Sequence, residues 1–177
     1  MVQLETQRLI MRQWRDVDIQ PFAAMNRDTR IMEYFPFFLD QEESAAMIKI
    51  FAERMQQQGF LYLPVIEKAT GTFAGMVNLA PVSFEAHFTP AFEIGWRLAF
   101  NFWGKGYASE AAKKLIEYGF NELNLGEIVS FTAIGNKRSS AVMERIGMAF
   151  EGEFDHPGLP QENQLRRHAL YQINRTL

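Results

Sequence analysis

A turn between two regular patterns, residues 103–110 (Trp-Gly-Lys-Gly-Tyr-Ala-Ser-Glu), constrains the fold more than any other stretch of the sequence. Before this turn, residues 91–98 alternate β-favouring apolar side chains with Glu, Gly and Arg, which predicts a strand. After it, small and apolar residues recur at helical spacing: Ala108, Ala111, Ala112, Leu115, Ile116 and Gly119. The turn therefore joins a strand to an amphipathic helix.

The start of that helix has the features of an anion-binding site. Its first backbone N–H groups lack partners inside the helix, the helix dipole favours negative charge there, and two glycines leave the backbone uncovered. A lysine also stands where a helix start usually carries Asp or Glu. We predict that a phosphate group binds to the turn formed by Gly104, Lys105, Gly106, Tyr107, Ala108 and Ser109. The alternative is an ordinary turn with a solvated lysine.

Two other phosphate-binding motifs fit this turn less well. A P-loop requires Gly-Lys followed by Ser or Thr, but Lys105 is followed by Gly106. A dinucleotide-binding fingerprint requires three glycines, and only Gly104 and Gly106 are present.

Composition sets the size and class of the protein. The 177 residues, 47% of them hydrophobic, are enough for one substantial core, so we expect a single domain over residues 1–177. The net charge is −3, from 18 basic and 21 acidic side chains, which does not favour nucleic acid as a partner. We find no repeat, linker or low-complexity tract.

The sequence also indicates which chemistry and location to expect. It has no cysteine, and its three histidines are too scattered for a zinc site, so we expect no metal. No apolar run reaches membrane length, and the first residues lack the pattern of a secretory signal. We therefore expect a cytoplasmic protein without a membrane partner, either a monomer or a homodimer.

The remaining segments complete a mixed α/β pattern with antiparallel and parallel neighbours. Helices are predicted after Asp16, after Asp40 with Glu43 as a capping box, and after Asn136. Residues 91–134 should form a parallel strand-helix-strand unit. The predicted strands are residues 8–14, 61–67, 72–80, 91–98, 127–134, 148–154 and 168–173.

Four segments together resemble the GNAT superfamily of acyl-CoA-dependent N-acetyltransferases, and within it the Rim branch, named for ribosomal-protein N-terminal acetyltransferases. The resemblance extends over nearly the whole chain and rests on Glu-Thr-Gln-Arg-Leu at 5–9, Glu-Ile-Gly-Trp at 93–96, the turn at 103–108, and Asn-Lys-Arg-Ser at 136–139 with Gly-Met at 147–148. It implies a central mixed, mostly antiparallel sheet with helices on both faces and acetyl-CoA as the co-substrate.

The sequence departs from the family pattern at two positions. The acyl-CoA motif is usually Q/R-x-x-G-x-G/A; Gly106 and Ala108 match its last two places, but Trp103 replaces the Gln or Arg. Many members carry a tyrosine seven residues after the position of Asn136, where this chain has Met143. The backbone N–H groups that would bind the phosphates are retained, whereas the tyrosine that usually acts as the general acid is missing.

The resemblance assigns roles to residues outside the turn. The extended arm of the coenzyme would lie along Trp96, Arg97 and Leu98 like an added strand, and Asn136 would hold it. Ser139 matches the place of a hydroxyl near the leaving sulfur; the alternative is a helix cap. From its place on the central strand, Glu93 is our candidate base, although it could equally be a surface or salt-bridged strand carboxylate. Asp155 and His156 are reserve bases.

The pKa values of the candidate amines narrow the choice of acceptor. At pH 7 an α-amine with a pKa of about 7.7–8.0 is roughly a tenth neutral, whereas a lysine with a pKa near 10.4 is neutral at only about one part in several thousand. We therefore predict a protein or peptide N-terminus as acceptor. A small-molecule amine is the second choice, and a non-catalytic acyl-CoA sensor is a third. Three segments should wall the acceptor site: residues 34–38, 84–90 and 156–167.

Overall fold

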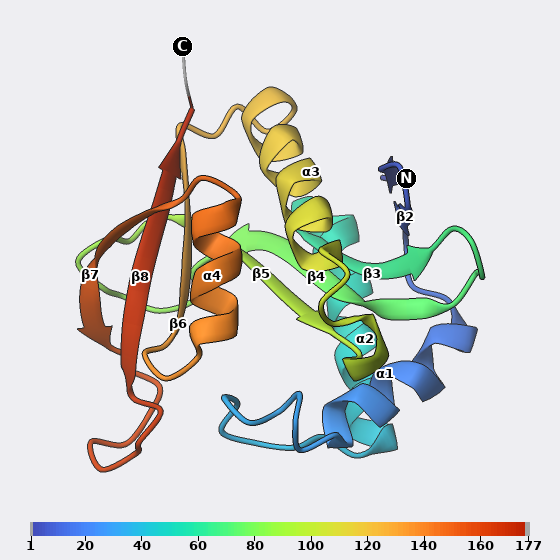
Figure 1. Cartoon of the computed structure of the whole chain (residues 1–177), viewed down its shortest axis with the longest axis horizontal. Helices are drawn as coiled ribbons and strands as arrows, with labels where there is room; N and C mark the ends of the chain where they lie inside the picture. Colours follow the sequence, from blue (N-terminus) through green and yellow to red (C-terminus); the bar gives the residue numbers. More distant parts are fainter. Residues whose placement is uncertain (1, 176–177) are drawn as a thin grey trace.

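The structure is a computed structural model that describes residues 2–175 (Figure 1). Eight strands form one sheet: β1 (Leu4–Glu5), β2 (Leu9–Met11), β3 (Leu61–Glu67), β4 (Phe73–Pro81), β5 (Phe92–Leu98), β6 (Glu127–Ala133), β7 (Ala149–Asp155) and β8 (Arg167–Asn174). The four α-helices are α1 (Ile19–Arg27), α2 (Gln41–Gln58), α3 (Tyr107–Asn121) and α4 (Lys137–Arg145). Short 3₁₀ helices cover Asp16–Asp18 and Phe100–Phe102.

The sheet is mixed and mostly antiparallel, as the resemblance implied. Its strand order is β1-β2-β3-β4-β5-β6-β8-β7, and only β5 and β6 run parallel among the described strands. Helix α3 connects these two parallel strands, so the predicted strand-helix-strand unit is confirmed.

Helices cover both faces of the sheet because the long strands are apolar on both sides. Met76 and Val77 are neighbours in β4 and therefore point to opposite faces. Val77 belongs to the core that α3 and α4 share with the sheet, whereas Met76 belongs to the core under α1 and α2 (Figure 1). We call the second side the α1/α2 face.

Two boundary predictions near the N-terminus are wrong. The predicted strand 8–14 is only Leu9–Met11, because the chain turns away to place Trp14 against the α1/α2 core. Asp16 is not a helix cap: it starts a 3₁₀ turn, and the acidic group that bonds there is Asp18. The buried carboxylate of Asp18 accepts both terminal nitrogens of Arg12, at 2.7 and 2.9 Å.

The capping prediction for α2 is confirmed. The Asp40 carboxylate accepts the Glu43 N–H at 2.9 Å, and the Glu43 carboxylate accepts the Asp40 N–H at 2.8 Å. Gly59 ends the helix in the left-handed conformation, with φ 72°. None of the helices in residues 2–175 is long and apolar enough to span a membrane.

Candidate active site

The predicted anion turn has the geometry that its glycines suggested. Gly104 and Gly106 both have positive φ, 74° and 79°, and Gly106 is the N-cap residue of α3. Within the described chain, the N–H groups of residues 104–109 have no hydrogen-bond acceptor outside or inside the helix. The free N–H groups therefore lie at the positive end of the dipole of a 15-residue helix, which is the arrangement that favours phosphate binding.

The side chains of this turn contact residues of neighbouring elements and thereby hold the turn in position. The Tyr107 hydroxyl donates to Glu67 at 2.6 Å, and Ser109 is buried and accepts from Arg145 at 3.3 Å. Lys105 has its Nζ 3.8 Å from Glu67 Oε1, so its charge is partly compensated rather than free. The hydrogen bond from Tyr107 lowers the pKa of Glu67. The backbone N–H groups of residues 104–109 remain available for a phosphate.

A clamp that the sequence reasoning missed fixes this helix start to the N-terminal strands. Glu110, in the first turn of α3, accepts the Thr6 hydroxyl, the Arg8 N–H and the Arg8 side chain. Although burial acts in the opposite direction, these hydrogen bonds lower the pKa of Glu110. The resemblance at residues 5–9 was the available signal, but a sequence pattern alone does not show which residue these side chains bind.

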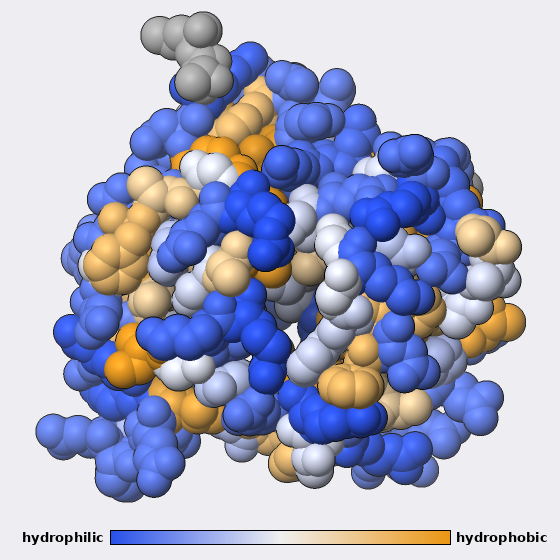
Figure 2. All heavy atoms as spheres, viewed as in Figure 1, coloured by the Kyte–Doolittle hydropathy of each residue, from blue (hydrophilic) through white to orange (hydrophobic). Residues whose placement is uncertain are grey.

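An opening for an extended ligand lies where β5 and β6 separate. The two strands pair at one position, Glu93 with Val129, and the Ser130 hydroxyl donates to the Ile94 carbonyl at 2.8 Å. Beyond this point β6 pairs only with β8, and Figure 1 shows the two strands diverging. Figure 2 shows a narrow hollow near the middle of the same face, between the positions of α4 and the start of α3.

The opening exposes backbone rather than side chains on its β5 side. Trp96 and Leu98 pack into the core on the α3 side, so only their peptide groups can meet a ligand in the opening. The side chain of Arg97 lies on the α1/α2 face, against Met76. The separation of the strands is a tertiary feature, because each strand pattern alone is regular.

On the other side of the opening, Asn136 and Ser139 form one hydrogen-bonded pair at the start of α4. The Asn136 carbonyl oxygen caps the helix by accepting the Ser139 N–H at 3.2 Å, and its amide donates to the Ser139 hydroxyl at 3.1 Å. The helix cap is therefore Asn136, and the alternative that Ser139 caps the helix is wrong. The Ser139 hydroxyl accepts a bond and keeps its own proton for another partner.

Glu93 is the acidic group nearest to the strand junction. It is half-buried, and within residues 2–175 its carboxylate has neither a hydrogen bond nor an ion pair, so the salt-bridged alternative is wrong. Burial raises the pKa of Glu93 to about 7. A carboxylate with this pKa can accept a proton near neutral pH.

Asn78 is a second polar residue close to the strand junction, and the sequence analysis did not identify it. It is paired with Gly95 across β4 and β5, and a Cβ on Gly95 would lie 2.6 Å from the Asn78 side-chain oxygen. Strand alternation places Gly95 between Glu93 and Arg97 on one face. The signal in the sequence was a single amide within the apolar run 73–80. Glu93, Asn78 and Arg97 thus form a polar row across the α1/α2 face.

Two of the three segments predicted to wall the acceptor site lie beside the polar row of Glu93, Asn78 and Arg97. Phe84 and Phe88 of the 84–90 loop pack with Val129 and Phe131 beside β5, as a packed loop should. The 28–40 segment reaches the opposite side, where the Tyr34 hydroxyl donates to the Gly135 carbonyl at 3.0 Å. In the same segment Phe35, Phe37 and Phe38 are exposed rather than part of the core.

The two reserve bases are engaged elsewhere. Asp155 forms ion pairs with Arg166 and Arg167. The His156 ring packs against Phe84 in a tilted arrangement, with ring centroids 4.5 Å apart, and its Nδ1 accepts a hydrogen bond from the Gly158 N–H. Burial, together with the neighbouring His168, lowers the pKa of His156. Unlike Asp155, Glu93 has no ion pair within residues 2–175.

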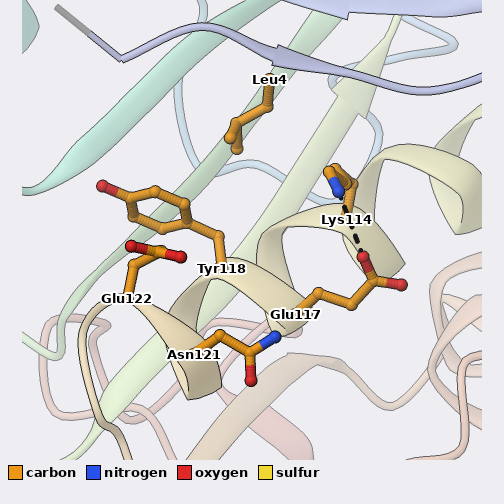
Figure 3. Close-up of a pocket in the computed structure, with 6 residues that line it drawn as sticks. All are labelled: Leu4, Lys114, Glu117, Tyr118, Asn121 and Glu122. Atoms are coloured by element: carbon orange, nitrogen blue, oxygen red, sulfur yellow. Dashed lines mark hydrogen bonds and ion pairs between the residues drawn. The ribbon is translucent and has the colours of Figure 1, made fainter.

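A hollow on the outer side of α3 is separate from this site. Leu4 of β1 and residues from the second half of α3 line it, with Lys114 and Glu117 paired at 3.3 Å (Figure 3). It lies at the opposite end of α3 from Gly106. Within residues 2–175 no group of His, Asp and Glu is arranged to hold a metal ion.

Comparison with known proteins places the chain in a family. Residues 8–149 match the model of the acetyltransferase (GNAT) domain. The chain belongs to the GNAT acetyltransferase family. It is 34% identical to the uncharacterized N-acetyltransferase YnaD of Bacillus subtilis over 151 residues, which is 85% of each chain.

Solved structures support the same GNAT fold. A GNAT-family acetyltransferase from Bacillus anthracis superposes with a TM-score of 0.80 and 27% identity over 98% of both chains. The microcin C7 self-immunity acetyltransferase MccE, solved in complex with acetyl-CoA and AMP, superposes with a TM-score of 0.78 over 96% of this chain and 93% of its own, at 20% identity. The second likeness concerns the fold alone. The protein is thus a GNAT acetyltransferase, and the free N–H groups of residues 104–109 lie at the start of its central helix.

Proposed function

We propose that this enzyme transfers the acetyl group of acetyl-CoA to the α-amine of a peptide or protein N-terminus. The observation that carries the proposal is the unpaired Glu93 carboxylate at the β5–β6 junction, with a pKa of about 7. A base of this pKa suits an α-amine, because an α-amine with a pKa near 8 needs only modest help to be neutral at pH 7. A lysine side chain would require a stronger base.

The transfer would occur by direct attack. The neutral amine nitrogen forms a bond to the thioester carbonyl carbon, and a backbone N–H near Trp96 stabilises the oxyanion. Glu93 takes the proton that the amine loses, directly or through one water. When the carbon–sulfur bond breaks, the Ser139 hydroxyl, whose proton is not used in its bond with Asn136, protonates the thiolate. Ser139 then takes up a proton from solvent and Glu93 releases its proton to solvent, which restores both groups.

The cofactor arrangement follows from the same geometry. The pyrophosphate of the coenzyme would bind the free N–H groups of residues 104–109, and its amide arm would lie along β5 at residues 96–98. Asn136 lies at the start of α4, where its side-chain oxygen caps the helix and its amide donates to Thr132 and Ser139, so it would hold the arm by positioning this side of the opening.

A competition experiment tests the acceptor class. The enzyme would be incubated with acetyl-CoA and an equimolar mixture of a peptide with a free N-terminal alanine, the same peptide with a blocked N-terminus and an internal lysine, and an aminoglycoside. Mass spectrometry should find the acetyl group mainly on the N-terminal alanine. Acetylation mainly of lysine or the sugar would contradict the acceptor and leave the GNAT assignment intact.

A further inference from the structure

Arg97 is a half-buried arginine without an acidic partner among residues 2–175. Its Nε is fully buried and has no hydrogen-bond acceptor. Its two terminal nitrogens contact only thioether sulfurs, that of Met32 at 3.3 Å and that of Met76 at 3.7 Å. Sulfur is a weak acceptor, so the five N–H donors of this guanidinium lack a strong acceptor within the described residues.

The surroundings of Arg97 are apolar. The guanidinium carbon lies 4.8 Å from the ring centroid of Phe35 and 5.6 Å from that of Phe22. Burial lowers the pKa of Arg97 to about 10, so the side chain remains cationic at neutral pH. Holding an unpaired cation among such groups is costly, and buried charges in proteins are normally paired.

Arg12 follows that general rule. Its side chain is only 11% exposed, and it pairs with the buried Asp18 at 2.7 Å. The fold therefore can place carboxylates beside arginines. Beside Arg97 the fold places methionine and phenylalanine instead, so the positive charge of the guanidinium remains available to a ligand.

Arg97 also lies in the right place for the acceptor. It shares the α1/α2 face with Glu93, four residues away along β5, or about 13 Å between Cα atoms. Asn78 covers the Gly95 position between them. Met32 and Phe35 belong to the 28–40 segment, which forms one side of the acceptor site. An acceptor with its amine between Glu93 and Arg97 would extend one end toward the guanidinium.

We propose that Arg97 binds a carboxylate carried by the acceptor within about two residues of the amine that is acetylated. This inference rests on the proposed function. One cation in an apolar setting matches a monoanion, whereas a phosphate dianion would leave a buried negative charge. The planar guanidinium could form two parallel, charge-assisted bonds with the carboxylate in place of its contacts with sulfur. Arg97 would thus orient the acceptor and select against polycationic amines.

Two matched pairs of acceptors test the proposal by activity. One pair is Ala-Ala and Ala-Ala amide; the other is Ala-Asp-Ala amide and Ala-Asn-Ala amide. The wild-type enzyme should favour the acid over its neutral match at least tenfold in kcat/KM in one of the pairs. Arg97→Met should reduce that ratio to about twofold or less, and Arg97→Lys should restore part of it. Equal rates within both pairs in the wild type, or an unchanged ratio in Arg97→Met, would overturn the proposal.

A matched control and a stability measurement separate this role from a structural one. Arg27→Met removes an exposed arginine at the end of α1 and should leave the acid-to-neutral ratio unchanged. Because Arg97 has no acidic partner, Arg97→Met should unfold at the wild-type temperature or above it. A fall of several degrees would identify a structural arginine and contradict the proposal.

A binding measurement distinguishes failure of this inference from failure of the proposed function. Isothermal titration calorimetry of the CoA-saturated enzyme would compare N-acetyl-Ala-Ala with its amide. The acid should bind at least tenfold more tightly, and Arg97→Met should remove the difference. Absence of acetylation of all four peptides would contradict the peptide acceptor, while this titration would still decide the role of Arg97. Equal binding of acid and amide to the wild type would overturn the carboxylate site.

Discussion

The hydroxyl of Thr6 donates a hydrogen bond of 2.5 Å to Oε1 of Glu110, a residue 104 positions later in the chain. The same carboxylate accepts the Arg8 N–H at 3.0 Å and the Arg8 Nε at 2.7 Å. The N-terminal strands are thereby fixed to the first turn of α3, directly beside the N–H groups that face the opening. The position of the anion turn depends on this contact between two distant segments.

Glu110→Gln should therefore weaken both the fold and coenzyme binding. Each charge-assisted hydrogen bond that it impairs is worth about 1.5–3 kcal/mol, so the free energy of unfolding should fall by roughly 1–3 kcal/mol. Affinity for CoA should fall a few-fold because the turn is less firmly held. Urea denaturation and calorimetry measure the two effects. Glu117→Gln, on the exposed side of α3, is the control; an equal loss in both variants would contradict the clamp.

Gly106→Asp should abolish most of the affinity for CoA. The aspartate would place a negative charge at the N–H groups of the predicted phosphate seat. Gly106→Asn is the matched control, because Asn has nearly the same shape and tolerates the φ of 79° at this position. Calorimetry with CoA should show at least a tenfold larger loss for Asp than for Asn. Similar affinities in the two folded variants would mean that the phosphates bind elsewhere.

Glu93→Gln should change the pH dependence of the rate. In the wild type, kcat/KM for a peptide amine should contain an ionisation near pH 7, where the Glu93 carboxyl loses its proton. The variant should lose that ionisation and fall in rate at pH 7.5 by a factor of about 100. Glu122→Gln, an exposed residue after α3, should keep the wild-type profile. An ionisation near pH 7 that persists in Glu93→Gln would exclude this residue as the base.

The same substitution should affect stability with a definite sign. The pKa of Glu93 is raised in the folded state, from 4.5 to about 7, so between these values the folded protein binds more protons than the unfolded chain. Ionised Glu93 therefore destabilises the wild type fully above about pH 7 and not at all below about pH 4.5. Glu93→Gln should be more stable by on the order of 1–2 kcal/mol at pH 8, after allowance for partial exposure. Chemical denaturation at pH 5 and pH 8 should show this gain only at the higher pH.

Ser139→Ala should separate a chemical role from a capping role. The cap belongs to Asn136, so Ser139→Ala should cost less than about 0.5 kcal/mol, whereas Asn136→Ala should cost about 1 kcal/mol. If Ser139 protonates the leaving thiolate, its alanine variant should lower kcat at least tenfold with an unchanged KM for acetyl-CoA. Steady-state kinetics and thermal unfolding decide this. An unchanged kcat would remove Ser139 from the mechanism.

Features that depend on local spacing could be predicted from the order of the residues. The two glycines at 104 and 106 predicted the turn at the start of α3, and Asp40 with Glu43 predicted the start of α2. The order of the strands and helices predicted a mixed sheet with a parallel unit. The first two are set by residues within one turn of one another, and the third by the order of strands and helices along the chain. The family could be predicted from the same short motifs.

Features that depend on contacts between distant segments required the folded structure. The pKa of Glu93 follows from its burial at the junction of β5 with β6, and the role of Glu110 follows from its bonds to Thr6 and Arg8. Strand alternation placed Arg97 on a face, but a pattern of apolar and polar residues does not reveal whether a carboxylate will lie opposite it. Burial and pairing are properties of the packed molecule, so the groups left without partners could be recognised only after the chain had been folded.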